Sequence, residues 1–194
     1  MNARNLAVVA GLAALLFAAF RAFGWWGFSL VSSGIVFWLL QLTTRFLVPW
    51  SRWITPQVPS VTNRRFDTRF FVAAVPSGQD AVHDNVETTH SAWLKPRQAL
   101  VDYWERRIEL APPQIMSLVN LNHYNDVAHA MQSAGLRPPP TIQPEPFDDE
   151  NGRSICYPGD PRHSQKQPAM PGPSRLRYVQ GRFEPLQGFS AFFV

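Results

Sequence analysis

The stretch that decides the fold begins at Arg69 and reads RFFVAAV, ending at Val75. It is short and apolar, it is rich in phenylalanine and valine, and a Pro-Ser-Gly sequence follows it directly. An apolar run of this length that ends in turn residues is typical of a buried β-strand. We therefore expect a buried strand here, within a mixed α/β unit that spans roughly residues 46–135.

The residues after this strand predict one weaker strand and two helices. The weaker strand signal covers Glu87–Leu94 and ends before a proline. Apolar residues recur at helical spacing through Arg97–Glu109, which predicts the first helix. Pro112 and Pro113 stop that element and begin a second helix, because proline is favoured in the first helical turn. We expect the second helix to carry an apolar stripe and to end at Gly135.

The N-terminal residues 1–45 differ sharply in composition. Two apolar runs of about 18 residues, Leu6–Phe23 and Trp25–Leu42, contain Arg21 as their only charged residue. A helix of that length spans about 27 Å, close to the ~30 Å hydrocarbon core of a bilayer. Basic residues are more frequent outside the pair than between its members, which favours a hairpin with both termini in the cytoplasm. We therefore predict a transmembrane helical hairpin, an inner-membrane location and a cytoplasmic soluble part.

Three other interpretations of this N-terminal zone stay open. The first run has the charged start and the small residues, near Ala18–Ala22, of a cleaved signal peptide. The two runs are also compatible with buried helices of a soluble core, or with a hairpin in which only the first run spans. We favour the hairpin because the second run has no place in a signal peptide and because so many consecutive residues lack charge.

Composition excludes several classes of protein. The chain of 194 residues has a formal net charge of +4, but residues 1–45 alone hold three arginines and no acid, so the remainder is nearly neutral. A basic surface for nucleic acid is therefore not expected. Cys156 is the only cysteine, which excludes an intrachain disulfide framework. Aromatic residues make up 13 % of the chain, too many for a wholly disordered protein.

The tail, residues 136–194, is rich in proline. The sequence SICYPGD, which starts at Ser154, predicts a strand leading into a turn. The sequence RLRYVQGRFEP, which starts at Arg175, predicts a small β-hairpin around Gln180 and Gly181. The expected organisation is thus a membrane hairpin at 1–45, an α/β unit at 46–135 and a tail with a β-hairpin at 136–194.

Sequence motifs between Trp50 and Leu121 suggest a family. The block Arg-Phe-Asp-Thr-Arg-Phe-Phe occupies residues 65–71, and a Trp-Ile-Thr-Pro lead-in occupies residues 53–56. The downstream features that accompany it are Asp84, Glu87, Trp93, Ala99-Leu100 and Pro112-Pro113. This order resembles the C-terminal part of a Nudix hydrolase, and it is most similar to a bacterial branch related to coenzyme A and other nucleoside-diphosphate hydrolases. The CYPGDP and LRYVQGRFEP sequences of the tail resemble the same branch.

The resemblance implies metal-dependent hydrolysis of a diphosphate linkage in a nucleotide derivative, such as a coenzyme A-like compound, with Mg²⁺ or Mn²⁺ as cofactor. In the family, several glutamates of the Nudix box hold the cation and stand ahead of the Arg-Phe-Asp-Thr-Arg-Phe-Phe block. Here the hydrophobic residues 1–45 occupy that place and include no glutamate. Hard divalent cations require oxygen ligands. We therefore expect that this chain lacks the Nudix box, binds no Mg²⁺ or Mn²⁺ and does not hydrolyse the substrate by itself.

The resemblance also implies site residues. It suggests Glu87, together with Asp84, as a base or metal ligand, although a solvated loop carboxylate is an equally good interpretation. Arg65 and Arg69 are predicted to contact substrate phosphates through charge-assisted hydrogen bonds. Asp67 is an alternative, purely structural partner for these two arginines.

No metal ligand is predicted elsewhere. On the helix predicted at Arg97–Glu109, Asp102, Glu105 and Glu109 share one face, but Arg106 follows Asp102 by four residues and is expected to pair with it. We therefore interpret these acids as a solvated surface and not as a substitute cation site.

The sequence thus predicts an α+β protein with a transmembrane hairpin, a partial Nudix-like α/β unit and a Pro-rich tail. The expected partners are the membrane and a nucleotide-diphosphate ligand, and the oligomeric state is not determined. The main function predicted is that of a membrane-attached, truncated Nudix-like protein. A non-catalytic membrane protein whose soluble part binds a nucleotide or a protein is a second hypothesis, and a rearranged chain without evolved activity is a third.

Overall fold

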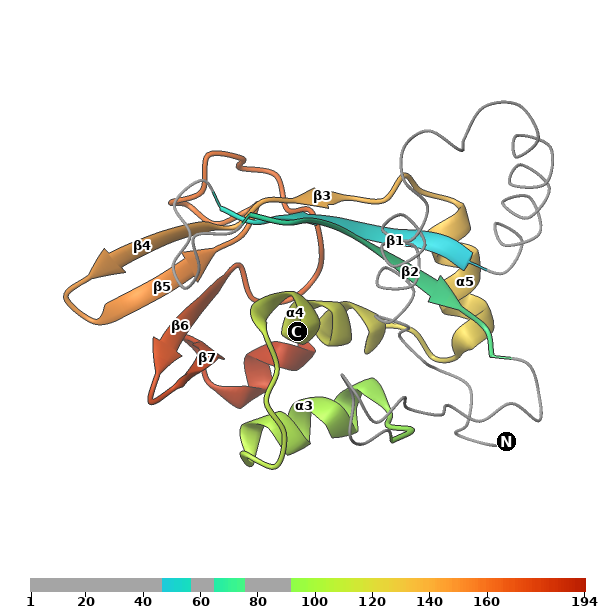
Figure 1. The fold of residues 1–194 in the computed structure, drawn as a ribbon, viewed down its shortest axis with the longest axis horizontal. Helices are drawn as coiled ribbons and strands as arrows, with labels where there is room; N and C mark the ends of the chain where they lie inside the picture. Colours follow the sequence, from blue (N-terminus) through green and yellow to red (C-terminus); the bar gives the residue numbers. More distant parts are fainter. Residues whose placement is uncertain (1–46, 57–64, 76–91) are drawn as a thin grey trace, which may run out of the picture.

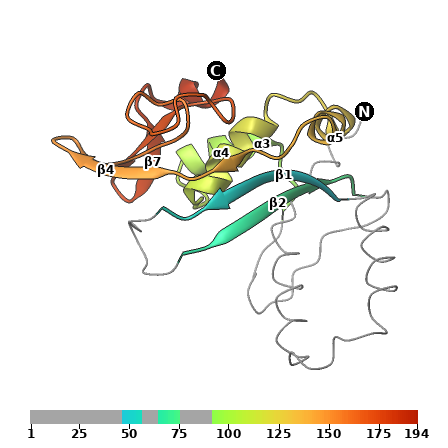
Figure 2. The same cartoon turned by 90° about the horizontal axis from the view of Figure 1, so that it is seen from above.

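The computed structural model describes residues 47–56, 65–75 and 92–194. These residues form a three-stranded sheet in the order β2-β1-β3, a four-stranded sheet in the order β4-β5-β6-β7, and three α-helices. The two sheets lie end to end, and helix α4 packs beneath the point where they meet (Figure 1). Helices α3, α4 and α5 all lie on one side of the β1–β2 pair, together with the second sheet (Figure 2).

The strand β1 (Leu47–Ile54) is the middle strand of the first sheet. It pairs antiparallel with β2 (Asp67–Ala73) and parallel with β3 (Thr141–Ile142). The register with β2 shifts between Pro49 and Ser51, which leaves Trp50 as an extra, bulged residue. A bulge reorients the side chain of the inserted residue, and Trp50 is only 2 % exposed.

The strand predicted at Arg69–Val75 is confirmed as β2, with its start moved two residues earlier. Its predicted burial is wrong, because Val72 is the only buried residue of the seven. The physical reason is that the described helices all lie on one side of the β1–β2 pair, so alternate residues of β2 point away from the core (Figure 2). The weaker strand expected at Glu87–Leu94 lies mostly outside the described residues, and residues 92–95 are not part of a strand.

Strand β3 was not predicted, and it brings the tail into the first sheet. It follows three consecutive prolines at positions 138–140, which favour an extended backbone. The backbone N–H of Arg52 donates to the Pro140 carbonyl at 2.9 Å, next to the parallel pairing of Trp53 with Ile142. A two-residue strand gives no alternation to detect, so only the tertiary structure reveals it.

The first predicted helix forms as α3 (Pro96–Trp104) but ends five residues earlier than expected. The chain turns after the helix, where Arg106 has a φ of +62° and the N–H of Arg107 bonds to the Asp102 carbonyl at 2.8 Å. The second predicted helix is wrong as a single element, because it forms α4 (Pro112–Leu121) and α5 (Val127–Gly135). Asp126 separates them as a helix cap, since its carboxylate accepts from the His129 N–H at 2.8 Å.

The tail forms a four-stranded second sheet, which is more than the strand and the small hairpin that were predicted; the strand predicted from Ser154 is part of β5. Its four antiparallel strands are β4 (Glu145–Asp149), β5 (Gly152–Cys156), β6 (Arg175–Val179) and β7 (Arg182–Pro185). The predicted hairpin is confirmed as β6–β7, and its two-residue loop has φ +47° at Gln180 and +91° at Gly181. Positive φ at both loop residues is the geometry that matches the twist of two paired strands. A final 3₁₀ helix covers Phe189–Phe193.

The main core joins the tail to the α/β unit. Trp53 of β1, Leu100 of α3 and Ile115 of α4 belong to the same buried cluster as Leu176 of β6 and Phe192 of the 3₁₀ helix. The phenol of Tyr103, on α3, donates to the Phe183 carbonyl of β7 at 2.8 Å and accepts from its N–H at 2.9 Å. The division into residues 1–45, 46–135 and 136–194 stays a prediction, but the second and third of these parts share one core.

The predicted fold class needs a correction. None of the helices in the described part of the chain is long and apolar enough to cross a bilayer. Each of the three has 9 or 10 residues, or about 15 Å, which is half the hydrocarbon thickness. The transmembrane hairpin expected at Leu6–Leu42 lies outside the described residues, so the fold that the structure supports is a two-sheet α+β arrangement without it. Because no described helix could cross a bilayer, the expected inner-membrane location is corrected as well.

Candidate functional site

The predicted phosphate-binding arginines lie at the β1–β2 pair. Arg52 and Arg69 are direct cross-strand partners, so their side chains leave the same face of the sheet. Trp53 points to the opposite face, into the core and toward the helices that Figure 2 shows on that side. Arg65 stands just before β2, is exposed, and donates to the Thr55 carbonyl at 3.4 Å. The structure therefore places Arg65 and Arg69 at the same exposed strand pair.

Asp67 has a different partner from the one considered in the sequence. Arg52 holds it with both arms of the guanidinium, Nε to Oδ1 at 2.8 Å and Nη2 to Oδ2 at 2.6 Å. These hydrogen bonds from Arg52 hold the pKa of the Asp67 carboxyl below its usual value. Arg69 adds only a weaker electrostatic effect on Asp67. Within the described part of the chain, the guanidinium of Arg69 makes no hydrogen bond or ion pair, so it can meet an incoming anion.

The predicted catalytic residue Glu87 and its neighbour Asp84 lie outside the described residues. Their roles stay predictions, and their positions relative to Arg65 and Arg69 are not defined.

The described residues do not fit a divalent cation site. No group of three or more His, Cys, Asp or Glu side chains among them could hold a metal ion. Asp102 is already engaged by Gln98 at 2.8 Å and by Arg107 at 3.0 Å, and Glu105 pairs with Arg107 as well. The expected pairing of Asp102 with Arg106 is wrong, because the early end of α3 turns Arg106 toward Gln180, 3.0 Å away. Glu105 and Glu109 are exposed but lie after the end of α3, whereas the Asp102 side chain is only 14% exposed, so the three acids do not form one solvated helix face.

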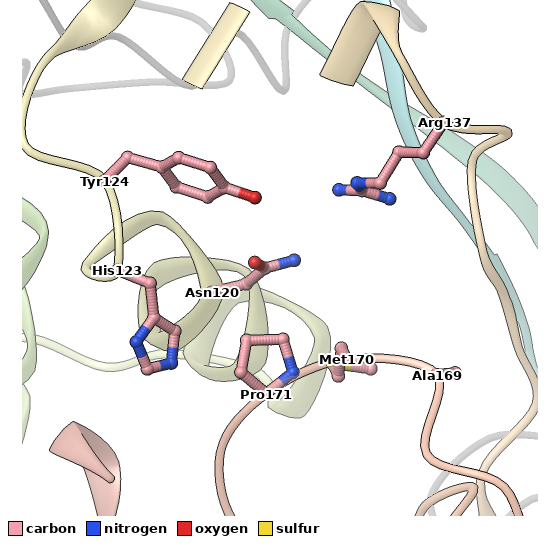
Figure 3. A pocket seen from close by; sticks show the side chains of 7 residues that line it. All are labelled: Asn120, His123, Tyr124, Arg137, Ala169, Met170 and Pro171. Atoms are coloured by element: carbon pink, nitrogen blue, oxygen red, sulfur yellow. The ribbon is translucent and has the colours of Figure 1, made fainter. Parts of the chain in front are cut away.

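A hollow of about 380 Å³ opens on the same side of the sheet as the helices, and no sequence motif indicated it. Its polar lining comes from Asn120, His123, Tyr124 and Arg137, and its apolar lining comes from residues 169–171. Figure 3 shows the Asn120 amide, the Tyr124 hydroxyl and the Arg137 guanidinium turned toward one shared space. We call this hollow the Asn120 pocket.

Three separate parts of the fold build the Asn120 pocket. Asn120 is near the end of α4, and Tyr124 follows in the loop to α5, where its hydroxyl lies 3.1 Å from Ser133 Oγ. Arg137 follows α5 and lies over the ring of Trp50, 5.0 Å from its centre. The remaining wall belongs to the long loop between β5 and β6. The one signal in the sequence is Asn120 itself, a polar residue within the otherwise apolar end of a helix.

Cys156 is not a candidate nucleophile. It is 1 % exposed, and its thiol donates to the Glu145 carbonyl at 3.2 Å. Burial, and to a lesser degree the nearby carboxylates of Asp160 and Glu145, raise the pKa of this thiol to about 11. A thiol that stays protonated at neutral pH is a poor nucleophile.

The similarity to known proteins lies mainly in the β1–β2 region and in helices α3 and α4. Residues 41–121 match the family model of the NUDT19 Nudix domain. Acyl-coenzyme A diphosphatase NUDT19 of Xenopus laevis is 39% identical over 79 residues, which are 40% of this chain and 21% of the relative. The human protein of the same name is 32% identical over 75 residues, 39% of this chain and 20% of the relative.

A third relative extends further along the chain. Putative nudix hydrolase 7 of Caenorhabditis elegans is 26% identical over 114 residues, 59% of this chain and 38% of the relative. The chain therefore spans about a fifth of the two NUDT19 proteins and less than two fifths of the nematode protein. No solved structure matches the chain significantly. The resemblance to a bacterial branch in particular stays a prediction. Residues 41–121 thus form part of a Nudix-like domain that is related to the acyl-coenzyme A diphosphatases.

Proposed function

We propose that this chain carries the substrate-binding part of a Nudix-type diphosphate hydrolase and that its 194 residues alone do not catalyse the hydrolysis. The observation that carries the proposal is the position of Arg69 within the matched region. Its guanidinium is exposed on a sheet face, beside an aspartate that Arg52 already neutralises. A guanidinium that makes no hydrogen bond or ion pair with the described residues is suited to a ligand phosphate, with which it forms charge-assisted hydrogen bonds.

The substrate class follows from charge and from the relatives. Arg65 and Arg69 together offer two exposed guanidinium groups at one strand pair, which suits the adjacent negative charges of a diphosphate. Two of the relatives are named acyl-coenzyme A diphosphatases. We therefore propose a diphosphate-linked nucleotide of the coenzyme A type as the ligand, with Arg65 and Arg69 on its phosphates.

The proposed lack of turnover rests on the distribution of acids. Nudix hydrolases generally use divalent metal cations, and such cations require several oxygen ligands. The chain has no aspartate or glutamate before Asp67, and the described residues do not assemble a ligand set. We propose Glu87 as the one acid or base of the family site that the chain retains, and no step through a metal is derived.

A turnover assay tests the catalytic half of this proposal. The purified chain is incubated with coenzyme A and either Mg²⁺ or Mn²⁺, and released phosphorylated products are followed by phosphorus NMR. We expect no metal-dependent product above the protein-free control. Turnover that disappears in Glu87→Gln would overturn the proposed inactivity and would identify Glu87 as catalytic.

A binding assay tests the substrate half. Isothermal titration calorimetry with coenzyme A is compared for the unmodified chain, Arg69→Gln, and Arg162→Gln as a control that removes an exposed arginine of the tail. Loss of one charge-assisted hydrogen bond is worth about 1.4 kcal/mol, so Arg69→Gln should weaken binding about tenfold. Equal affinity in all three proteins would exclude Arg69 as a phosphate contact.

A further inference from the structure

The Asn120 pocket is lined by the polar end of a largely buried side chain, the amide of Asn120. Asn120 is 5 % exposed, and no hydrogen bond joins its side-chain amide to another residue that the structure describes. The amide atoms are not among the fully buried atoms without a partner in the described part of the chain, so the small exposed part of this residue is the part that lines the pocket. Figure 3 shows where the amide is directed, into the space that it shares with Tyr124 and Arg137. A ligand in that space could therefore form hydrogen bonds with the amide in place of water.

The pocket is also lined by a positively charged side chain, Arg137, whose position is restricted by an aromatic neighbour. Arg137 is the only permanently charged residue among those that line the pocket, and it forms no ion pair within the described part of the chain. Its guanidinium lies 5.0 Å from the centre of the Trp50 ring, and the bulge of β1 buries that ring. Stacking on an aromatic face restricts a guanidinium without using its hydrogen-bond donors. The donors of Arg137 are thus free for a carboxylate or a phosphate.

The apolar wall of the pocket is fixed against helix α4. Met170 and Pro171 form much of this wall, and Gly172 follows them with a φ of +101°. A Cβ atom on Gly172 would come within 2.4 Å of a Val119 methyl, so the loop backbone packs directly on the helix that carries Asn120. Polar groups and the apolar wall therefore keep a constant spacing, which lowers the entropy that a ligand loses when it binds.

We propose that the Asn120 pocket binds a small organic anion with three features. It carries a carboxylate or phosphate for Arg137, a neighbouring hydrogen-bond donor and acceptor for the Asn120 amide, and an apolar or aromatic body for Met170 and Pro171. An amide group or an aminopurine edge supplies the required donor and acceptor side by side. The volume of about 380 Å³ is within the ~300–1,000 Å³ of small-molecule sites. This proposal does not depend on diphosphate hydrolysis or on Arg65 and Arg69.

The experiment uses two probes that differ in their anionic group. Adenosine monophosphate combines an aminopurine edge with a phosphate, and N-acetylphenylalanine combines an amide, an aromatic ring and a carboxylate. Each is titrated into the full chain by calorimetry, beside a matched compound without the anion, adenosine or N-acetylphenylalaninamide. We expect one of the two probes to bind at least tenfold more tightly than its uncharged match, and the tighter probe identifies the anion. Dissociation constants weaker than about 1 mM for both probes would overturn the proposal.

Variants locate the binding. Arg137→Gln should weaken the tighter probe about tenfold, whereas Arg162→Gln removes an arginine that stacks on Phe147 and is not part of the pocket lining, and should leave the affinity unchanged. Asn120→Leu should also weaken binding. Its midpoint of thermal unfolding should not be lower than that of the unmodified chain, because the amide forms no hydrogen bond with the described residues that the substitution would break. Unchanged affinity in both pocket variants, or a lowered midpoint in Asn120→Leu with unchanged affinity, would show that the amide has only a structural role.

Discussion

Two arginine–aspartate pairs in this protein have nearly the same geometry and very different surroundings. On the outer face of the first sheet, Arg52 binds Asp67 at 2.8 and 2.6 Å. In the tail, Arg175 binds Asp160 at 3.0 and 2.6 Å. The side chains of the first pair are 40% and 46% exposed, and those of the second pair are 20% and 3% exposed.

The difference in exposure distinguishes the buried Arg175–Asp160 pair, which has a structural role, from the exposed Arg52–Asp67 pair, which lies near the proposed binding surface. Asp160 also accepts from the Arg162 N–H at 2.8 Å and from Ser174 Oγ at 3.2 Å, so it ties together the two ends of the loop between β5 and β6. Among the described residues, the Asp67 carboxylate accepts hydrogen bonds from Arg52 alone, and both side chains are exposed to solvent. A buried ion pair is costly to break on one side, whereas an exposed pair contributes little.

The largest expected effect comes from breaking the buried pair. Asp160→Ala leaves Arg175 without its partner and releases the loop, so we expect the free energy of unfolding to fall by about 4 kcal/mol. Urea denaturation followed by circular dichroism measures this change. A loss below about 1 kcal/mol would place the Asp160 pair in the same class as exposed pairs.

The next effect tests how tightly the same loop packs on α4. Gly172→Ala adds a Cβ that would approach Val119 to 2.4 Å, at a φ of +101°. Strain and overpacking together should cost about 3 kcal/mol. Gly152→Ala is the matched control, because Gly152 has a φ of +99° with nothing within 4 Å of the added atom, and it should cost only about 1 kcal/mol. Equal losses in the two variants would mean that the loop moves away from the helix easily.

Acid should weaken the protein in a way that depends on Asp160. Burial by itself would raise the pKa of Asp160, but hydrogen bonds from Arg175, the Arg162 N–H and Ser174 outweigh it, and the net pKa is lowered. A carboxyl with a lowered folded-state pKa stabilises the fold above its ordinary value of about 3.9, and this stabilisation is lost as the pH falls through the lowered value. Unfolding curves below about pH 4 should therefore be less pH-dependent for Asp160→Asn than for the unmodified chain. Parallel curves would show that Asp160 does not contribute to acid unfolding.

The smallest expected effect is on the exposed pair. Asp67→Asn should change the midpoint of thermal unfolding far less than Asp160→Asn does, and the small difference should shrink further in about 0.5 M salt because the pair is screened. Differential scanning calorimetry at two salt concentrations provides the measurement. A drop as large as that of Asp160→Asn would remove the distinction between the two pairs.

Local signals in the sequence predicted several elements correctly. The strand at β2, the start of α3 within one residue of the predicted Arg97, the start of α4 at Pro112 and the β6–β7 hairpin all depend on residues within one short segment. Where a prediction failed, a more distant or more subtle interaction decided the outcome. Asp126 divides the expected long helix through a cap, and the pairing of β3 with β1 joins residues about 90 positions apart.

The candidate site shows the same division. The motif around residues 65–71 indicated a Nudix relative, and the comparison supports that family for residues 41–121. It could not indicate that Asp67 pairs with Arg52 and leaves Arg69 available, because strand register sets that choice. Nor could any motif indicate the Asn120 pocket, whose lining comes from α4, from the end of α5 and from the loop before β6.

By itself, the sequence determined the kinship of residues 41–121, the absence of acids before Asp67 and the local strand, helix and turn preferences, because each is a property of neighbouring residues. Only the tertiary structure decided that the Pro-rich tail forms a four-stranded sheet and contributes to the shared core. It also decided that Arg52 and not Arg69 pairs with Asp67, and that the Asn120 amide lines a pocket. These outcomes depend on pairing and burial between distant segments, which local composition does not encode.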